Sequence, residues 1–147
     1  MLVRRSVVQT LVGSLLGFAV AAACGEDDSS GAEGESAGQS CDAAEQCYED
    51  ADRDAIAGEV LCLDRVEGGY CTHECVTDAD CCAAEGECDG RPQVCAPFES
   101  TGMMMCFLSC ESADVEGDAD EYCSTYAHAE FGCRSTGGGS DNRKVCA

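Results

Sequence analysis

The chain has 147 residues, including 15 cysteines, and its 29 acidic and eight basic residues give a formal net charge of −21. This charge excludes nucleic acid as a partner, because its phosphates would be repelled, and it disfavours contact with anionic membrane surfaces. Large apolar residues are scarce after residue 40. We therefore expect the dense cysteines to form a disulfide scaffold in an oxidising compartment.

Residues 1–23 predict a cleaved signal peptide. Arg4 and Arg5 precede an apolar run from Val7 to Val20, and the small residues Ala21–Ala23 follow that run; this is the layout of an export signal. Glycines and polar residues interrupt the run. A membrane-spanning helix, which needs about 20 apolar residues, is therefore the less favoured alternative.

Cys24 is the odd cysteine, since the other fourteen can form seven pairs. The sequence Ala21-Ala22-Ala23-Cys24 resembles the lipobox of bacterial lipoproteins, although that family more often has leucine at the position of Ala21. The resemblance implies acylation of Cys24 and attachment to a membrane through this lipid. Two or three acyl chains would make such an anchor lasting. In such lipoproteins, an aspartate at the position of Gly25 would retain the protein at the inner membrane, so Gly25 implies transport to the outer membrane. The alternative to acylation is cleavage by an ordinary signal peptidase after Ala23.

Residues 24–40 are expected to form the lipidated cysteine and a disordered tether. The segment after Cys24 reads GEDDSSGAEGESAGQS and contains no aromatic or branched apolar residue that could contribute to a core. A flexible coil of this length spans about 20–25 Å on average. The tether would thus hold the folded part, residues 41–147, away from the bilayer.

The strongest helical pattern of the folded part begins at Asp42. Asp42 and Glu45 resemble a capping box, and small or apolar residues recur at helical spacing until Gly58. Short strands are expected around residues 60–63, 69–72, 93–95, 104–108 and 143–146. The predicted class is a small, irregular, disulfide-rich fold of short strands and short helices.

Two Asp-Ala-Asp triplets, at residues 78–80 and 118–120, predict further helical turns. An aspartate at a helix N-cap accepts hydrogen bonds from the free backbone amides of the first turn. After the second triplet, Tyr122, Cys123 and Tyr126 fall on one helical face. We therefore interpret these triplets as helix caps.

The cysteines of residues 41–147 recur in a common order, which predicts loosely repeated units. A Cys-x3-Cys pair, an Asp-Ala-Asp triplet, further cysteines and a closing Val-Cys-Ala occur twice, with loops of different lengths between them. The expected units are about 41–70, 71–105 and 106–147, the first being shortened; chance similarity is the alternative. Up to seven disulfides are expected among Cys41, Cys47, Cys62, Cys71, Cys75, Cys81, Cys82, Cys88, Cys95, Cys106, Cys110, Cys123, Cys133 and Cys146.

Residues 71–95 contain six cysteines with an adjacent middle pair and resemble the inhibitor-knot miniproteins. Six cysteines allow fifteen pairings, and the resemblance implies Cys71–Cys82, Cys75–Cys88 and Cys81–Cys95. It also implies a small protease inhibitor, for which Arg91 would be the exposed bait. The whole repeat resembles Dickkopf-like and EGF-like modules and, more closely, the Cys-rich lipoproteins of predatory soil bacteria, a resemblance that implies no known activity.

Two acidic segments bear on calcium binding: the first, an EF-hand-like start, is rejected, and the second is kept as a candidate site. Asp50, Asp52 and Asp54 begin like an EF-hand loop, but Ala55 and Leu61 replace the glycine and the glutamate that such a loop requires. A denser run offers carboxylates for a weak extracellular calcium site, with a solvated acidic loop as the alternative. The residues of this run are Asp114, Glu116, Asp118, Asp120 and Glu121.

The sequence contains no catalytic signature, and we expect no enzymatic activity and no resident cofactor. The two histidines, His73 and His128, are expected at the solvated surface, and no serine or free thiol is placed as a nucleophile. The chain has no Cys-x2-Cys pair of the kind that binds zinc, and Met103–Met105 are expected to be apolar filler. The expected role is that of a cell-envelope lipoprotein whose domain binds an unknown protein or glycan or has a structural function; an inhibitor knot and a calcium-binding surface module are the alternatives.

Overall fold

A computed structural model describes residues 37–88, 90–98, 101–137, 139 and 142–147. The expected signal peptide, Cys24 and the tether as far as residue 36 lie outside these described residues. Within the described ranges, no helix has the length and apolar character needed to cross a membrane.

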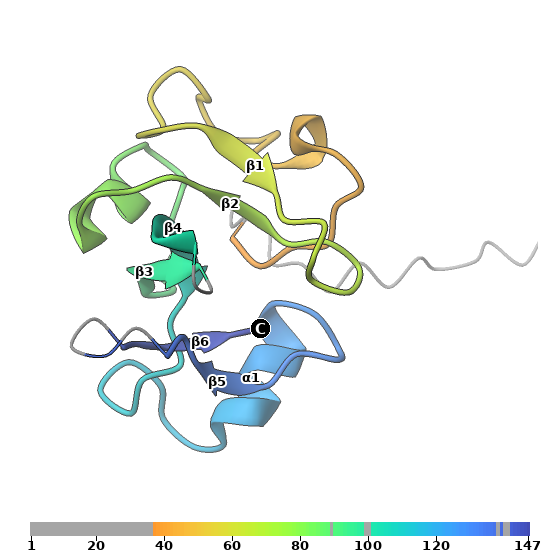
Figure 1. Cartoon of the computed structure of the whole chain (residues 1–147), viewed down its shortest axis with the longest axis vertical. Coiled ribbons are helices and arrows are strands. Elements are labelled where there is room, and N and C mark those ends of the chain that lie inside the picture. Colours follow the sequence, from red (N-terminus) through yellow and green to blue (C-terminus); the bar gives the residue numbers. More distant parts are fainter. Residues whose placement is uncertain (1–36, 89, 99–100, 138, 140–141) are drawn as a thin grey trace, which may run out of the picture.

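Three antiparallel β-hairpins form the framework and follow one another along the long axis of the molecule (Figure 1). Each hairpin is preceded by one short helical element, and together they make one repeated unit. The elements are η1 (Ala44–Gln46), β1 (Val60–Cys62) and β2 (Cys71–His73) in unit 1; η2 (Asp78–Cys82), β3 (Gln93–Phe98) and β4 (Met103–Leu108) in unit 2; and α1 (Ala119–Tyr126), β5 (Cys133–Ser135) and β6 (Lys144–Cys146) in unit 3. The predicted class, a small and irregular disulfide-rich fold with short strands, is confirmed.

Seven disulfides hold these elements, and six of them repeat one pattern. When Cys82 and Cys88 of unit 2 are set aside, each unit has four cysteines; the first pairs with the third and the second with the fourth, over separations of 20 to 25 residues. The third and fourth cysteines face each other across the hairpin. The repeated pairs are Cys41–Cys62 and Cys47–Cys71, Cys75–Cys95 and Cys81–Cys106, and Cys110–Cys133 and Cys123–Cys146, while Cys82–Cys88 is an addition in unit 2.

The pairing shows that the knot expected for residues 71–95 is wrong. Cys71 lies opposite Cys62 in the first hairpin, and its Cα is 5.3 Å from the Cα of Cys47, to which it is bonded. It is therefore already used within unit 1 and cannot bond to Cys82. None of the three disulfides implied by the inhibitor-knot resemblance is present: Cys71–Cys82, Cys75–Cys88 and Cys81–Cys95.

The same pairing moves the boundaries of the repeated units. Cys71 and Cys106 close a unit, whereas the boundaries expected at 71 and 106 made them open one. The repeated disulfides of the three units accordingly span Cys41 to Cys71, Cys75 to Cys106 and Cys110 to Cys146, and the closing strand of units 1 and 2 continues two residues beyond the last cysteine. Each Cys-x3-Cys spacing is the connection between two units.

The helix expected from Asp42 to Gly58 is wrong, because only the single turn of η1 forms. Gln46, and not Glu45, completes its cap: its Oε1 accepts a hydrogen bond from the Asp42 amide at 2.6 Å. The chain then turns away at Tyr48, which has a φ of 58°. Cys47 and Tyr48 are fully buried, so the Cys47–Cys71 disulfide and the burial of Tyr48 outweigh the helical pattern.

The Asp-Ala-Asp triplets open helical turns, as expected, and they also attach these turns to the hairpins. Asp118 is the N-cap of α1 and accepts hydrogen bonds from the amides of Asp120 and Glu121, whereas Thr77, one residue before the first triplet, is the N-cap of η2. Asp78 accepts from the Cys95 amide at 2.9 Å. In unit 3, Asp120 accepts from the equivalent Cys133 amide at 2.7 Å.

The end of the segment expected to be a tether belongs to the fold. Ala37 and Gly38 are buried, the Gly38 amide donates to the Cys71 carbonyl, and the Cys71 amide donates to the Gln39 carbonyl. Gly38 has a φ of 89°, and a Cβ at this position would approach the Cβ of Ala127 to 2.9 Å. The absence of a side chain thus allows this segment to pack closely, and the ordered domain includes residues 37–40.

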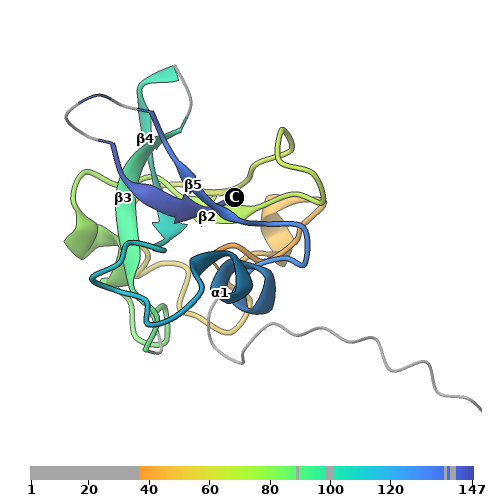
Figure 2. The same ribbon diagram turned by 90° about the horizontal axis from the view of Figure 1, so that it is seen from below.

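The three units share one main core. Isolated bridges between Glu74 and Met105 and between Ser109 and Val145 join successive hairpins edge to edge. The hairpins β3–β4 and β5–β6 are inclined to each other (Figure 2), and α1 lies beside β5 (Figure 1). The buried core residues come from all three units: Leu63, Tyr70, Val94, Ala96, Met105, Phe107, Leu108, Cys110, Cys123, Phe131, Val145 and Cys146.

Tyr70 connects the units within this core. Its ring centroid lies 5.3 Å from that of Phe107 in β4 and 5.6 Å from that of Phe131 in unit 3, and its hydroxyl accepts a hydrogen bond from the Leu108 amide at 3.0 Å. On the surface, Arg143 of unit 3 bonds to Asp78 in unit 2 and to Glu111.

Replacing Tyr70 by phenylalanine is expected to lower the free energy of unfolding by about 1–3 kcal/mol, because the buried Leu108 amide would lose its acceptor. Guanidinium unfolding of the protein with its disulfides intact measures this loss. Tyr126→Phe is the matched control: Tyr126 is 39% exposed, so its change should stay within about 0.5 kcal/mol. Equal stabilities for the two variants would contradict the assigned hydrogen bond.

Candidate functional site

His73 and Glu87 form an ion pair between units 1 and 2 that is closed to solvent. The His73 Nε2 lies 2.5 Å from the Glu87 Oε1, and both side chains have 0% exposure. The second oxygen, Oε2, accepts from the Ala84 amide at 2.8 Å, and the His73 Nδ1 lies 2.6 Å from the carbonyl oxygen of Ala57. Glu87 is supplied by the loop that Cys82–Cys88 closes.

The surroundings of His73 favour its protonated form. Burial alone would lower its pKa, but the hydrogen bond and charge of Glu87, together with the carbonyls of Ala57 and Glu74, raise the pKa above its ordinary value. A protonated imidazole has two N–H donors, one for Ala57 and one for Glu87. Because no substrate can reach these enclosed groups, the pair is suited to holding two units together and not to acid–base catalysis.

The expectation that both histidines are solvated surface residues is wrong for His73, and His128 is only partly exposed. His73 is fully buried with Glu87, whereas His128 is half-buried. The ring centroid of His128 lies 5.1 Å from that of Phe131, and its Nδ1 accepts from the Glu130 amide at 3.3 Å. Both rings therefore contribute to packing.

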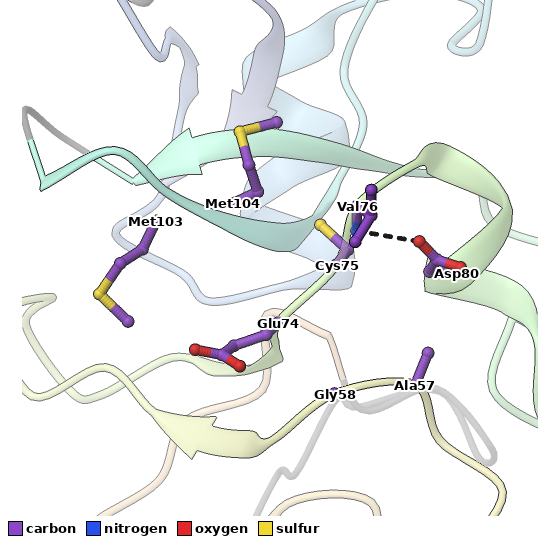
Figure 3. Close-up of a pocket in the computed structure, with 8 residues that line it drawn as sticks. All are labelled: Ala57, Gly58, Glu74, Cys75, Val76, Asp80, Met103 and Met104. Carbon is purple, nitrogen blue, oxygen red and sulfur yellow. Dashed lines mark hydrogen bonds between the residues drawn. The ribbon is translucent and has the colours of Figure 1, made fainter.

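Ala57 and Glu74, whose carbonyls face His73, also line a surface cavity of about 400 Å³, which we call the junction pocket. It lies where the loop before β1, the end of β2, η2 and β4 meet, so both unit 1 and unit 2 contribute walls. Figure 3 shows its lining side chains, with the Glu74 and Asp80 carboxylates on opposite sides of the Cys75–Val76 segment. The lining residues are Ala57, Gly58, Glu74, Cys75, Val76, Asp80, Met103 and Met104.

The junction pocket combines exposed apolar side chains with a fixed carboxylate. Val76 is 84% exposed and Met103 is 43% exposed, which is unusual for large apolar residues of this small domain. The Asp80 carboxylate accepts hydrogen bonds from the amides of Val76 and Thr77 and from the Thr77 hydroxyl. The two backbone hydrogen bonds lower the pKa of Asp80, so its carboxylate stays negatively charged to a more acidic pH than an ordinary aspartate.

The methionine run divides between core and surface. Met105 is 1% exposed and belongs to the main core, as expected for apolar filler. Met103 and Met104 instead line the junction pocket. The alternation of side chains along β4 produces this division for Met104 and Met105, because successive residues of a strand point to opposite faces.

Arg91 does not project as the bait of an inhibitor would. Its guanidinium carbon lies 4.3 Å from the centroid of the Tyr126 ring in α1, and the residue is half-buried. A second cavity, of about 310 Å³, lies around it and is also lined by Asp114 and Tyr122. The arginine thus joins unit 2 to unit 3 through a cation–π contact.

The five acidic residues proposed for calcium do not gather at one point. Asp118 caps α1 and Asp120 accepts from the Cys133 amide, whereas Asp114 accepts from the Ser109 hydroxyl at 2.5 Å. Asp114 lines the cavity beside Arg91, but Asp118 and Asp120 line a different one, of about 470 Å³. Glu116 and Glu121 are exposed. The carboxylates of Asp114, Asp118 and Asp120 therefore accept hydrogen bonds from backbone amides and a hydroxyl group of unit 3 and its connection, and they do not converge on one cation.

Among the described residues, three groups of potential metal ligands have their ligand atoms close together, and all three consist of cysteines. In each unit the Sγ atoms of the first, second and fourth cysteines lie within 4.8 Å of one another. These sulfurs belong to the two repeated disulfides of that unit. A metal requires thiolates, so in the oxidised protein these clusters are structural. Their members are Cys41, Cys47 and Cys71; Cys75, Cys81 and Cys106; and Cys110, Cys123 and Cys146.

Comparisons of the chain with protein-family profiles, with curated proteins and with solved structures found no match. The described residues themselves define the class of protein, a disulfide-rich domain of three units. Each unit consists of a helical turn and a hairpin linked by two crossing disulfides.

Proposed function

We propose that this protein is an exported lipoprotein, acylated on Cys24, whose disulfide-rich domain is a rigid binding module for a protein or glycan outside the cytoplasm. One observation carries the proposal: all fourteen cysteines from Cys41 to Cys146 are paired. Cys24 is then the single cysteine left over for acylation. Disulfides persist in oxidising compartments, which supports export, and Gly25 after the cysteine supports the outer membrane as the destination.

Several features favour binding over catalysis. The one buried acid–base pair that we identify, His73 with Glu87, is inaccessible to a substrate. A scaffold with seven disulfides presents its surface in a fixed conformation, which lowers the entropic cost of binding a partner. The inhibitor alternative loses its support, because the knot pairing is absent and Arg91 is engaged by Tyr126.

Replacing Cys24 by alanine is expected to abolish acylation and to release the protein from the membrane fraction. Cells would be labelled with an alkyne analogue of palmitate, and the protein would be followed in the membrane and soluble fractions. Ser29→Ala, in the tether, is the matched control and should keep both the label and the membrane location. Incorporation of label into the Cys24→Ala protein, or its retention in the membrane, would contradict the proposal.

A further inference from the structure

We infer that the junction pocket binds a peptide segment in which basic side chains flank an apolar side chain. This inference rests on the proposed function and specifies the partner: a protein that presents such a segment in extended form. Glu74 and Asp80 would contact the basic groups, and Val76, Met103 and Met104 would contact the apolar side chain.

The apolar part of the pocket is built as a contact surface. Val76 and Met103, with exposures of 84% and 43%, lie on the same cavity, although each could have been polar at no cost to the core. Methionine side chains are flexible and polarisable, so they adapt to differently shaped apolar partners. An apolar side chain placed against Val76, Met103 and Met104 would remove these surfaces from water.

The charges of the pocket select a cation. Two of its eight lining residues, Glu74 and Asp80, are acidic and none is basic. The carboxylates lie on opposite sides of Cys75 and Val76 (Figure 3), so two basic groups with an apolar group between them would match the arrangement. The net charge of −21 adds a long-range attraction for basic partners and repels acidic ones.

The walls of the pocket are preformed, which favours binding. The Cys75 amide donates to the Met104 carbonyl and the Glu74 amide to the Glu59 carbonyl, and Cys75 is bonded to Cys95. At Gly58, whose φ is 74°, a Cβ would overlap the Glu74 carbonyl. The backbone on both sides is thus fixed, and only side chains need to adjust to a ligand.

An extended peptide fits this arrangement because every second side chain lies on the same face of a strand. We would use a fluorescent peptide of sequence Gly-Lys-Ser-Leu-Ser-Lys-Gly with blocked ends as the probe. Fluorescence anisotropy would measure binding of this peptide to the whole protein. The protein would be held in phosphatidylcholine discs if it is membrane-bound, and used in solution if it is not. We expect saturable binding that weakens as salt is raised, since the ion pairs are exposed.

Two substitutions test the assigned contacts. Glu74→Gln is expected to weaken binding by about 3- to 5-fold, the range of a partly exposed ion pair, and Met103→Ser by about 5- to 10-fold through lost apolar contact. Glu116→Gln, an exposed acid in unit 3, is the control of equal charge and should bind as the wild type does. A count of free thiols and a circular dichroism spectrum establish that each variant is folded.

Control peptides identify the occupant. Exchanging both lysines for glutamate, or leucine for glycine, is expected to abolish or strongly weaken binding. The inference would be overturned if the original probe did not bind, or if Glu74→Gln and Glu116→Gln bound it with equal affinity. It would also be overturned if no peptide bound and only dodecyltrimethylammonium did, a detergent that combines a cationic group with an apolar tail. These results would leave acylation of Cys24 untouched, because the labelling experiment measures it independently.

Discussion

Replacing Glu87 by glutamine is expected to lower the free energy of unfolding by about 3–5 kcal/mol, the usual effect of removing one partner from a buried ion pair. Glu87 and His73 are both fully enclosed, so the imidazolium would be left without a counter-charge or would have to lose its proton. Guanidinium unfolding at slightly acidic pH, with the disulfides intact, measures the difference. Glu85→Gln, which alters an exposed acid two residues earlier, should change stability by no more than about 0.5 kcal/mol.

The effect of Glu87→Gln should depend on pH in a defined direction. The folded-state pKa of His73 is raised, so the stability that the pair contributes is fully present below the unfolded pKa of histidine, about 6.5. It is lost as the pH rises through the higher folded-state pKa. We therefore expect the difference between wild type and variant to be greatest at slightly acidic pH and to shrink as the pH rises above neutrality. A difference that grows with pH would contradict a protonated His73.

The general class of the fold could be predicted because it depends on the number of cysteines and of large apolar residues, which the sequence states directly. An even number of cysteines after Cys24 predicts complete pairing, and scarce large apolar residues predict a core that needs disulfides. The strands with apolar or cysteine residues, such as Val60–Cys62 and Met103–Leu108, lie close to their expected positions. Strand β5 was not expected, because two of its three residues, Arg134 and Ser135, are exposed and polar; only pairing with β6 makes it a strand.

The phase of the repeat could not be derived from spacing. A Cys-x3-Cys pair is compatible with two cysteines of one unit and with two cysteines in adjacent units. Only the hairpin register, which places Cys62 opposite Cys71 and Cys95 opposite Cys106, decides between these arrangements. The register depends on contacts between segments distant in the sequence, and no local pattern encodes those contacts.

The buried ion pair was missed for a similar reason. Glu87 lies between a glycine and a cysteine in an acidic chain and has nothing in its neighbours to distinguish it from the other acids. Its burial follows from the Cys82–Cys88 loop, which directs it toward the end of β2. The junction pocket has the same origin, since Val76 and Met103 are far apart in sequence and meet only because β2 and β4 join at the Glu74–Met105 bridge.

Removing the Cys123–Cys146 disulfide by alanine at both positions is expected to lower the free energy of unfolding by about 3–5 kcal/mol. The bridge closes a loop with a separation of 23 residues, for which the loss of loop entropy alone corresponds to about 3.5 kcal/mol. Both cysteines are fully buried in the main core, so lost packing adds to this effect. Changing both residues avoids a free thiol that could exchange with the remaining disulfides.

The form of this unfolding transition is as informative as its midpoint. Unit 3 shares its core with units 1 and 2 through Tyr70, Phe107 and Phe131, so we expect the double variant to unfold in a single transition. Far-ultraviolet circular dichroism and tyrosine fluorescence should therefore give the same midpoint. Thr125→Ala, an exposed position on α1, is the control and should leave that midpoint close to wild type. Two separate transitions in the double variant would show that unit 3 folds independently, and the common core would then contribute little to holding the three units together.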